Sequence, residues 1–114
     1  MSWSSGLTSS VIDEFRYILV GVIRSFGNKG AERIWQEQYV KSVDRNVQRA
    51  TLRKLELLHA AKDLEDLRIP PGNRLERLVG DRRGQHSIRV NAQWRICFVW
   101  RDGGAEDVEL VDYH

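Results

Sequence analysis

The hydrophobic pattern changes its period along the chain and predicts a strand followed by two helices. Residues 22–26, with the sequence VIRSF, favour a short strand. The next stretches have apolar residues three and four positions apart, as helices do. Asn28 is placed to cap the first helix. One face of this helix carries Ala31, Ile34, Trp35 and Gln38.

The second predicted helix is longer and starts near Asp44 or Ser42, either of which can cap it. Its apolar stripe consists of Val47, Ala50, Thr51, Leu55, Leu58 and Ala61. Its opposite side carries Arg45, Arg49, Arg53 and Glu56. We interpret these arginines as a solvated face, with RNA contact as the alternative. Pro70 and Pro71 end the helical region because proline has no N–H to donate.

From residue 75 onward the pattern is strand-like. Leu75 and Leu78 flank a short segment, and the sequence GDRRG that follows is typical of a turn. Strict alternation between Trp94 and Arg101 predicts a strand with one face on the helices. The inward side chains of this strand are Trp94, Ile96, Phe98 and Trp100.

The register of the two central strands follows from the turn between them. If residues 91–93 form a three-residue connection, Ile88 faces Ile96 and Arg89 faces Arg95. Like charges directly opposite each other destabilise a sheet, so this pair of arginines suggests an anionic ligand.

The order of the elements predicts an α+β fold with a short N-terminal strand, two helices, and then three to four antiparallel strands in a twisted sheet packed on the helices. In the last strand, Val108 and Leu110 are expected to point into the core. The arginine face then carries Asp107, Glu109, Val111 and Tyr113. We expect this face to be concave and basic.

Length and composition indicate one small soluble domain, because 114 residues with 41% hydrophobic content can bury a single core. The lone Cys97 cannot form an internal disulfide and has no partner at zinc-ligand spacing. We therefore expect a buried, inert thiol and a reducing cytoplasm. The apolar run at 17–23 is too short to span a membrane and lacks the features of a signal peptide.

The net charge of +2 is unevenly distributed. Residues 74–101 hold seven arginines and two acids, whereas residues 102–114 hold five acids and no Lys or Arg. This distribution fits a phosphate-binding surface and an ordinary salt-bridged sheet equally well. The sequence has no Gly-rich phosphate loop, metal-ligand spacing or nucleophile–base pair, so it implies no metal and no organic cofactor.

Three stretches carry a resemblance to a known family. They read VIRSF at 22–26, PPGNRLERLVGDRRGQHSIRVNAQWRICFVW at 70–100 and DVELVDYH at 107–114. Together they resemble the HigB-like toxins, in particular their GraT-like branch, within the RelE/ParE superfamily of type II toxin–antitoxin systems. The resemblance implies a toxin that cleaves mRNA on the translating ribosome, and a helix-turn-helix antitoxin of the HigA type as its partner.

The resemblance also implies roles for two arginines. Arg95, within the motif QWRI, matches the catalytic arginine of the family, and the bidentate fork of Arg suits a phosphate that gains charge. The structural alternative for Arg95 is a salt bridge to Glu109 or Asp107. Arg89 is the expected second phosphate contact.

Tyr113 and His114 match the terminal DYH motif of the family, whose side chains stack on the base or handle protons. Asp112 belongs to the same motif, and we expect it to contact RNA. The chain departs from the family where nuclease-competent members have His and Lys, because these positions are Glu76 and Val79. Glu76 could act as a base in place of the missing histidine. Candidates for the missing positive charge are Arg77, Arg82 and Arg83.

The resemblance covers residues 22–114, and we take this range as the toxin domain. Residues 1–21 form an N-terminal extension, either an added amphipathic helix or an upstream extension of the reading frame. Members of the family begin with Met where this chain has Val22, so we expect Val22 to be the native start.

Four functions compete on the sequence alone. The leading one is a ribosome-dependent mRNA endoribonuclease, and the second is a non-cleaving inhibitor that binds the ribosome or RNA. The third is a poison of DNA gyrase, against which the QWRI and DYH motifs argue. The fourth is a salt-bridged α+β domain with no toxin role.

Overall fold

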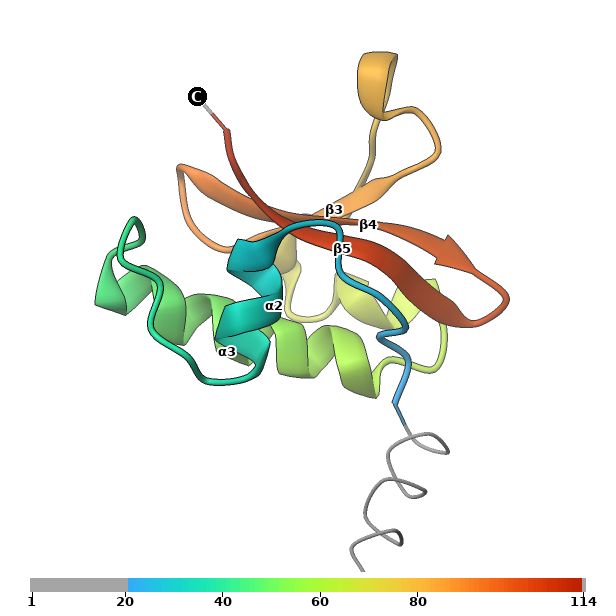
Figure 1. The fold of residues 1–114 in the computed structure, drawn as a ribbon. Coiled ribbons are helices and arrows are strands. Elements are labelled where there is room, and N and C mark those ends of the chain that lie inside the picture. The colour runs from blue at the N-terminus through green and yellow to red at the C-terminus, as the bar shows by residue number, and fades with distance from the viewer. Residues whose placement is uncertain (1–20, 114) are drawn as a thin grey trace, which may run out of the picture.

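The computed structural model describes residues 21–113, so the interpretations of residues 1–20 and of His114 lie outside the described part of the chain. The described residues form two helices packed on one side of an antiparallel sheet (Figure 1). This α+β arrangement confirms the predicted fold class.

The first helix, α2 (Lys29–Trp35), begins at the predicted cap. The side-chain oxygen of Asn28 accepts a hydrogen bond from the backbone N–H of Ala31 at 3.1 Å. The helix is shorter than expected, because Glu37 adopts a left-handed backbone with φ of 61°. Gln38 therefore lies beyond the helix and not on its inner face.

The second helix, α3 (Arg45–Ala60), is capped by Asp44, which was one of the two predicted candidates. It ends well before the prolines, because Ala61 turns to an extended conformation. Two short 3₁₀ helices, η1 (Leu64–Arg68) and η2 (Pro71–Asn73), fill the connection to the sheet.

The sheet has four strands in the order β2, β3, β4, β5, and all neighbours are antiparallel. They are β2 (Glu76–Arg77), β3 (His86–Arg89), β4 (Trp94–Arg101) and β5 (Gly104–Asp112). A third short 3₁₀ helix, η3 (Gly80–Arg82), lies between β2 and β3 and rises above the sheet on the side away from the helices (Figure 1).

The strand expected at the start of the domain is reduced to two isolated bridges. Ile23 and Phe26 form parallel bridges with Ala105 and Val108 of β5. Between these bridges β5 bulges at Asp107, whose φ is 53°. The bulge is an irregularity of the β4–β5 ladder, and between the two bridges the first segment follows the edge of β5 without forming a continuous strand.

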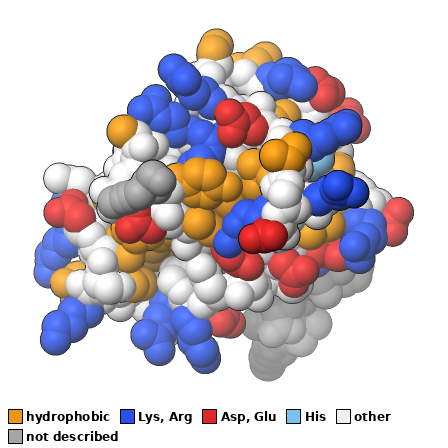
Figure 2. Space-filling model, turned by 90° about the horizontal axis from the view of Figure 1, so that it is seen from above, with side chains coloured by type: hydrophobic (Ala, Val, Ile, Leu, Met, Phe, Trp, Pro, Cys, Tyr) orange, Lys and Arg blue, Asp and Glu red, His pale blue; other side chains and the backbone are white. Residues whose placement is uncertain are grey.

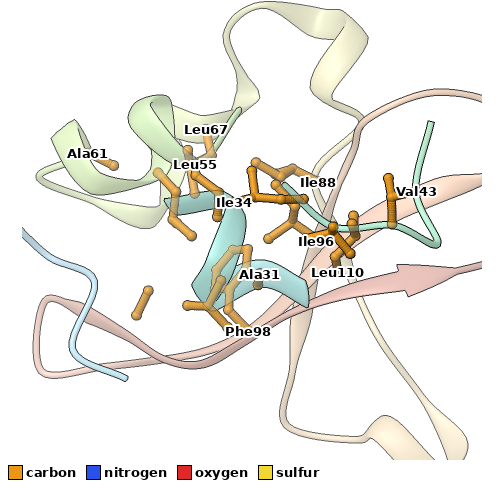
Figure 3. Packing of buried hydrophobic residues seen from close by; sticks show 14 residues of the cluster. Ala31, Ile34, Val43, Leu55, Ala61, Leu67, Ile88, Ile96, Phe98 and Leu110 are labelled. Carbon is orange, nitrogen blue, oxygen red and sulfur yellow. The ribbon is translucent and has the colours of Figure 1, made fainter. Parts of the chain in front are cut away.

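The core lies between the helices and one face of the sheet (Figure 3). Its fully buried side chains from the strands are Ile88, Ile96, Phe98 and Val108. The helices contribute Ala31, Ile34, Leu55 and Leu58. Each large apolar side chain that is removed from water stabilises the fold by about 1.5–3 kcal/mol. The helices do not cover the opposite face of the sheet, where the candidate functional site lies (Figure 1).

Candidate active site

The face of the sheet turned away from the helices carries the paired arginines. Arg89 lies opposite Arg95, as predicted, and Ser87 lies opposite Cys97. Across the next ladder, Glu109 of β5 also pairs with Cys97. Figure 2 shows this side from above, with an apolar patch surrounded by Lys and Arg side chains and with acidic side chains among them. The face therefore carries both signs of charge.

The guanidinium of Arg95 is buried and held by several acceptors. Only 9% of the residue is exposed. Its Nε donates to the hydroxyl of Ser87 at 2.7 Å, and its Nη2 donates to the carbonyl of Arg74 at 2.7 Å. A carboxylate oxygen of Glu76 lies 3.5 Å from Nη2. Arg95 is thus a fixed cation whose counter-ion is largely exposed.

The structural alternative for Arg95, a salt bridge to Glu109 or Asp107, is wrong. Glu109 pairs with Arg82 at 3.2 Å, and Asp107 lies at the exposed bulge of β5. Glu76 is the ion-pair partner of Arg95 instead. The β2–β3 ladder places Glu76 opposite Ser87, whose hydroxyl accepts a hydrogen bond from Arg95.

The other predicted RNA-binding arginines lie in different places. Arg89 donates from Nε to the carbonyl of Asn91 at 3.1 Å, within its own turn. Arg83 is exposed at the end of η3. Arg77 pairs with His86 and therefore lies on the opposite face of the sheet from Arg95. The structure brings Arg82 to the candidate site but does not bring Arg77 there.

Tyr113 lies beside the arginines, at the end of β5. Its hydroxyl is 4.0 Å from the sulfur of Cys97, and its backbone N–H donates to the carbonyl of Gln93 at 2.6 Å. Burial raises the pKa of Tyr113, and the neighbouring thiol adds to this, whereas Arg82 and Arg95 oppose it. The phenol thus keeps its proton at neutral pH, and its oxygen accepts the weak hydrogen bond from the Cys97 thiol.

Cys97 is a fully buried thiol, as predicted. Burial raises its pKa, and this effect outweighs the hydrogen bond to Tyr113 and the nearby positive charges. Because the thiolate is the nucleophilic form, a thiol that keeps its proton is a poor nucleophile. Cys97 therefore forms part of the floor of the site.

Asp112 lies opposite Trp94, at the start of β4. One of its carboxylate oxygens accepts from the side-chain amide of Gln93 at 3.2 Å. Gln93 thus holds both Asp112 and the backbone of Tyr113, which fixes the end of β5 next to the candidate site.

The two groups that accept hydrogen bonds from Arg95 were not predicted from the sequence. The hydroxyl of Ser87 could have been found, because the period of two places Ser87 on the same face as Arg89. The carbonyl of Arg74 could not have been found, because its direction depends on the left-handed backbone of Arg74 itself, with φ of 46°, at the end of η2. Asn73 fixes this turn by donating to the carbonyl of Leu67 at 3.1 Å.

His86 belongs to the core side of the sheet. Its ring stacks with Phe98 at a centroid distance of 6.3 Å, and its Nδ1 is buried without a partner among the described residues. Burial lowers the pKa of His86, and the charges of Arg77 and Arg68 lower it further. It is therefore neutral at physiological pH and lies away from Arg95.

Two other kinds of site are absent from residues 21–113. No group of three or more His, Cys, Asp or Glu side chains in this range could hold a metal ion. No helix in the same range is long and apolar enough to cross a membrane.

Comparison of the sequence with known proteins places this small α+β domain in a class of bacterial toxins. The family model for HigB-like toxins, described as the RelE-like toxin of the type II toxin–antitoxin system HigB, matches residues 24–114.

Two relatives support the match. Toxin HigB-1 of Vibrio cholerae is 48% identical over 82 residues, which cover 67% of this chain and 86% of the relative. Endoribonuclease HigB of Proteus vulgaris is 33% identical over 94 residues, which cover 82% of this chain and 100% of the relative. The chain belongs to the HigB-like toxin family. The resemblance seen in the sequence is confirmed. Toxins of this family pair with an antitoxin in a type II system, so the partner of this chain is an antitoxin.

Proposed function

We propose that the chain is a metal-independent endoribonuclease that inhibits translation by cleaving mRNA on the ribosome. The observation that carries the proposal is the buried guanidinium of Arg95, which is fixed by hydrogen bonds beside the carboxylate of Glu76 and near the phenol of Tyr113. The name of the Proteus relative, an endoribonuclease, supports the same activity.

Cleavage of RNA without a metal requires three functions. A base removes the 2′-OH proton, a cation stabilises the charge that develops on phosphorus, and an acid protonates the leaving 5′-oxygen. Arg95 supplies the cation. Glu76 is the candidate base, and Tyr113 is the candidate acid because its raised pKa keeps the phenol protonated. His114 is retained as a second candidate for proton transfer.

Three of the candidate RNA-binding arginines lie on the face that carries this centre, whereas Arg77 lies on the opposite face. Arg82 lies beside it through its ion pair with Glu109, while Arg83 and Arg89 lie towards the edge of the same face. We further propose that a helix-turn-helix antitoxin of the HigA type neutralises the toxin, and that the toxin acts on ribosomes in the cytoplasm.

The test uses ribosomes programmed with a defined mRNA and the purified full-length chain. New 5′ ends are mapped by primer extension for the wild type and for Arg95→Ala. We expect cuts in the A-site codon that fall by two or more orders of magnitude in Arg95→Ala, because one preorganised charge contributes about 10²–10³ in rate. Arg49→Ala, on the exposed side of α3, is the matched control and is expected to cleave normally.

One observation favours a second candidate, a non-cleaving inhibitor that binds the ribosome. Val79 stands where nuclease-competent relatives have Lys, and its side chain is 81% exposed and apolar. In the same assay this candidate predicts that translation stops while the message remains whole. Intact mRNA together with normal translation would contradict both candidates.

A further inference from the structure

The hydroxyl of Ser87 contacts the candidate catalytic arginine and has no role in the proposed chemistry. It accepts from the Nε of Arg95 at 2.7 Å, and the carbonyl of the same serine lies 3.4 Å from Nη2. The carbonyl of Arg74 accepts from Nη2 at 2.7 Å. Two residues from different segments thus hold one guanidinium.

These contacts all involve two of the three nitrogens of a planar group. The Nε and Nη2 hydrogens of an arginine point from the same side of the guanidinium, and Nη1 forms the far corner. Within residues 21–113, the hydrogen bonds and ion pair of Arg95 involve only Nε and Nη2. These contacts therefore leave the N–H groups of Nη1 available to a ligand.

The position of Ser87 explains why this hydroxyl is available. Ser87 is fully buried and lies at the centre of the sheet, with Glu76 as its partner on β2 and Cys97 as its partner on β4. A buried cation is costly unless its donors are satisfied. A small polar side chain at this position satisfies Nε and still leaves room for the arginine to lie across the strands.

The carbonyl of Arg74 is equally fixed. Asn73 is fully buried, and its amide donates to the carbonyls of Leu67 and Ile69 at 3.1 and 3.3 Å. Lys54 of α3 donates to the oxygen of the same amide. The turn that presents this carbonyl to Arg95 is thus tied to the helical layer.

We propose that Ser87 is a positioning residue, which orients the guanidinium of Arg95 so that Nη1 faces the scissile phosphate. This inference rests on the proposed endoribonuclease function, because it assigns Ser87 a part in the same reaction. Ser87 contacts no reacting atom and acts through Arg95 alone.

The kinetic test compares Ser87→Ala with Ser87→Thr on programmed ribosomes. We expect Ser87→Ala to lower kcat by about 10–10² at nearly unchanged KM, because a misplaced reacting group costs rate of this order. Ser87→Thr keeps the hydroxyl and is expected to restore the rate. Ser42→Ala, at an exposed serine before α3, is the matched control. Equal kcat in Ser87→Ala and the wild type would overturn the proposal.

A second readout does not depend on cleavage. In nitrogen-15 NMR spectra, the Nε–H of Arg95 is expected to give a slowly exchanging signal that is lost in Ser87→Ala and kept in Ser87→Thr. An unchanged signal in Ser87→Ala would also overturn the proposal. If the wild type does not cleave mRNA, the proposed function fails, while the NMR signal still decides whether Ser87 orients the arginine.

If Ser87→Ala does not fold, Ser87→Cys tests whether the Ser87 hydroxyl orients Arg95. Ser87→Cys keeps the size of the side chain and replaces the oxygen by a weaker acceptor. Thermal unfolding identifies which variants are folded. In a folded Ser87→Cys variant we expect the Nε–H signal to exchange faster and kcat to lie between those of alanine and threonine.

Discussion

Glu76 and Arg95 form an ion pair between unequal partners. The arginine side chain is 11% exposed, whereas the glutamate side chain is 58% exposed. Because Ser87 and Arg74 also accept hydrogen bonds from the guanidinium, the exposed carboxylate can move away while the cation keeps these partners. Glu76 therefore has two effects to consider: its charge competes with a phosphate for Arg95, and its oxygen can take a proton.

Glu76→Gln separates these two effects. Removal of the negative charge is expected to tighten binding of a programmed ribosome whose mRNA carries 2′-deoxyribose at the A-site codon, which cannot be cleaved. Loss of the base is expected to lower cleavage of normal mRNA by about 10²–10⁴. Tighter binding with unchanged cleavage would show that Glu76 is a counter-ion and not the base.

At the scale of the elements, the sequence predicted what depends on local pattern. The facing of Arg89 and Arg95 follows from strict alternation and a short turn, and Asn28 was recognisable as a cap. The partner of Arg95 was not predictable, because Glu76 reaches it through a strand of two residues that has no periodicity of its own. The bulge at Asp107 was not predictable either, because it depends on a left-handed backbone conformation. The sequence also did not indicate that the first segment pairs with β5 through isolated bridges only.

A histidine connects the end of α3 to the first segment of the domain. The Nδ1 of His59 accepts from the backbone N–H of Ile23 at 3.2 Å, and its ring lies 4.9 Å from that of Trp35. Burial lowers the pKa of His59 below its ordinary value of 6.5. The neutral ring is therefore the form that the fold requires, because a proton on Nδ1 would remove the hydrogen bond.

The resulting stability change has a definite sign. Below about pH 6.5 the unfolded chain binds a proton that folded His59 resists, so the free energy of unfolding falls as the pH falls. We expect urea denaturation to show lower stability at about pH 5.5 than at about pH 7.5. His59→Asn keeps an acceptor at this place and does not titrate, so its decline should be smaller. Since His86 also has a lowered pKa, some decline should remain. Identical slopes in both proteins would contradict the assignment to His59.

At the scale of the whole molecule, the acidic strand β5 neutralises part of the basic surface. Glu109 pairs with Arg82, and Glu106 lies 3.0 Å from Arg101 and 3.6 Å from Arg24. Two of the seven arginines in residues 74–101 therefore have an acidic partner on β5. This pairing means that the count of arginines overstates the charge available to RNA, and that the exposed arginines on the site face matter most.

The two faces of the molecule can be distinguished by the salt dependence of RNA binding. Arg83 follows η3, which rises above the sheet on the side of the candidate site, whereas Arg49 lies on the helical layer (Figure 1). Each phosphate contact contributes about 0.7 to the slope of log K against log salt for single-stranded nucleic acid. We expect Arg83→Gln to reduce the slope by about this amount and Arg49→Gln to leave it unchanged, measured by fluorescence anisotropy with a labelled RNA oligonucleotide. An equal reduction in both variants would show that the helical arginines also contact RNA, which was the alternative that the sequence left open for them.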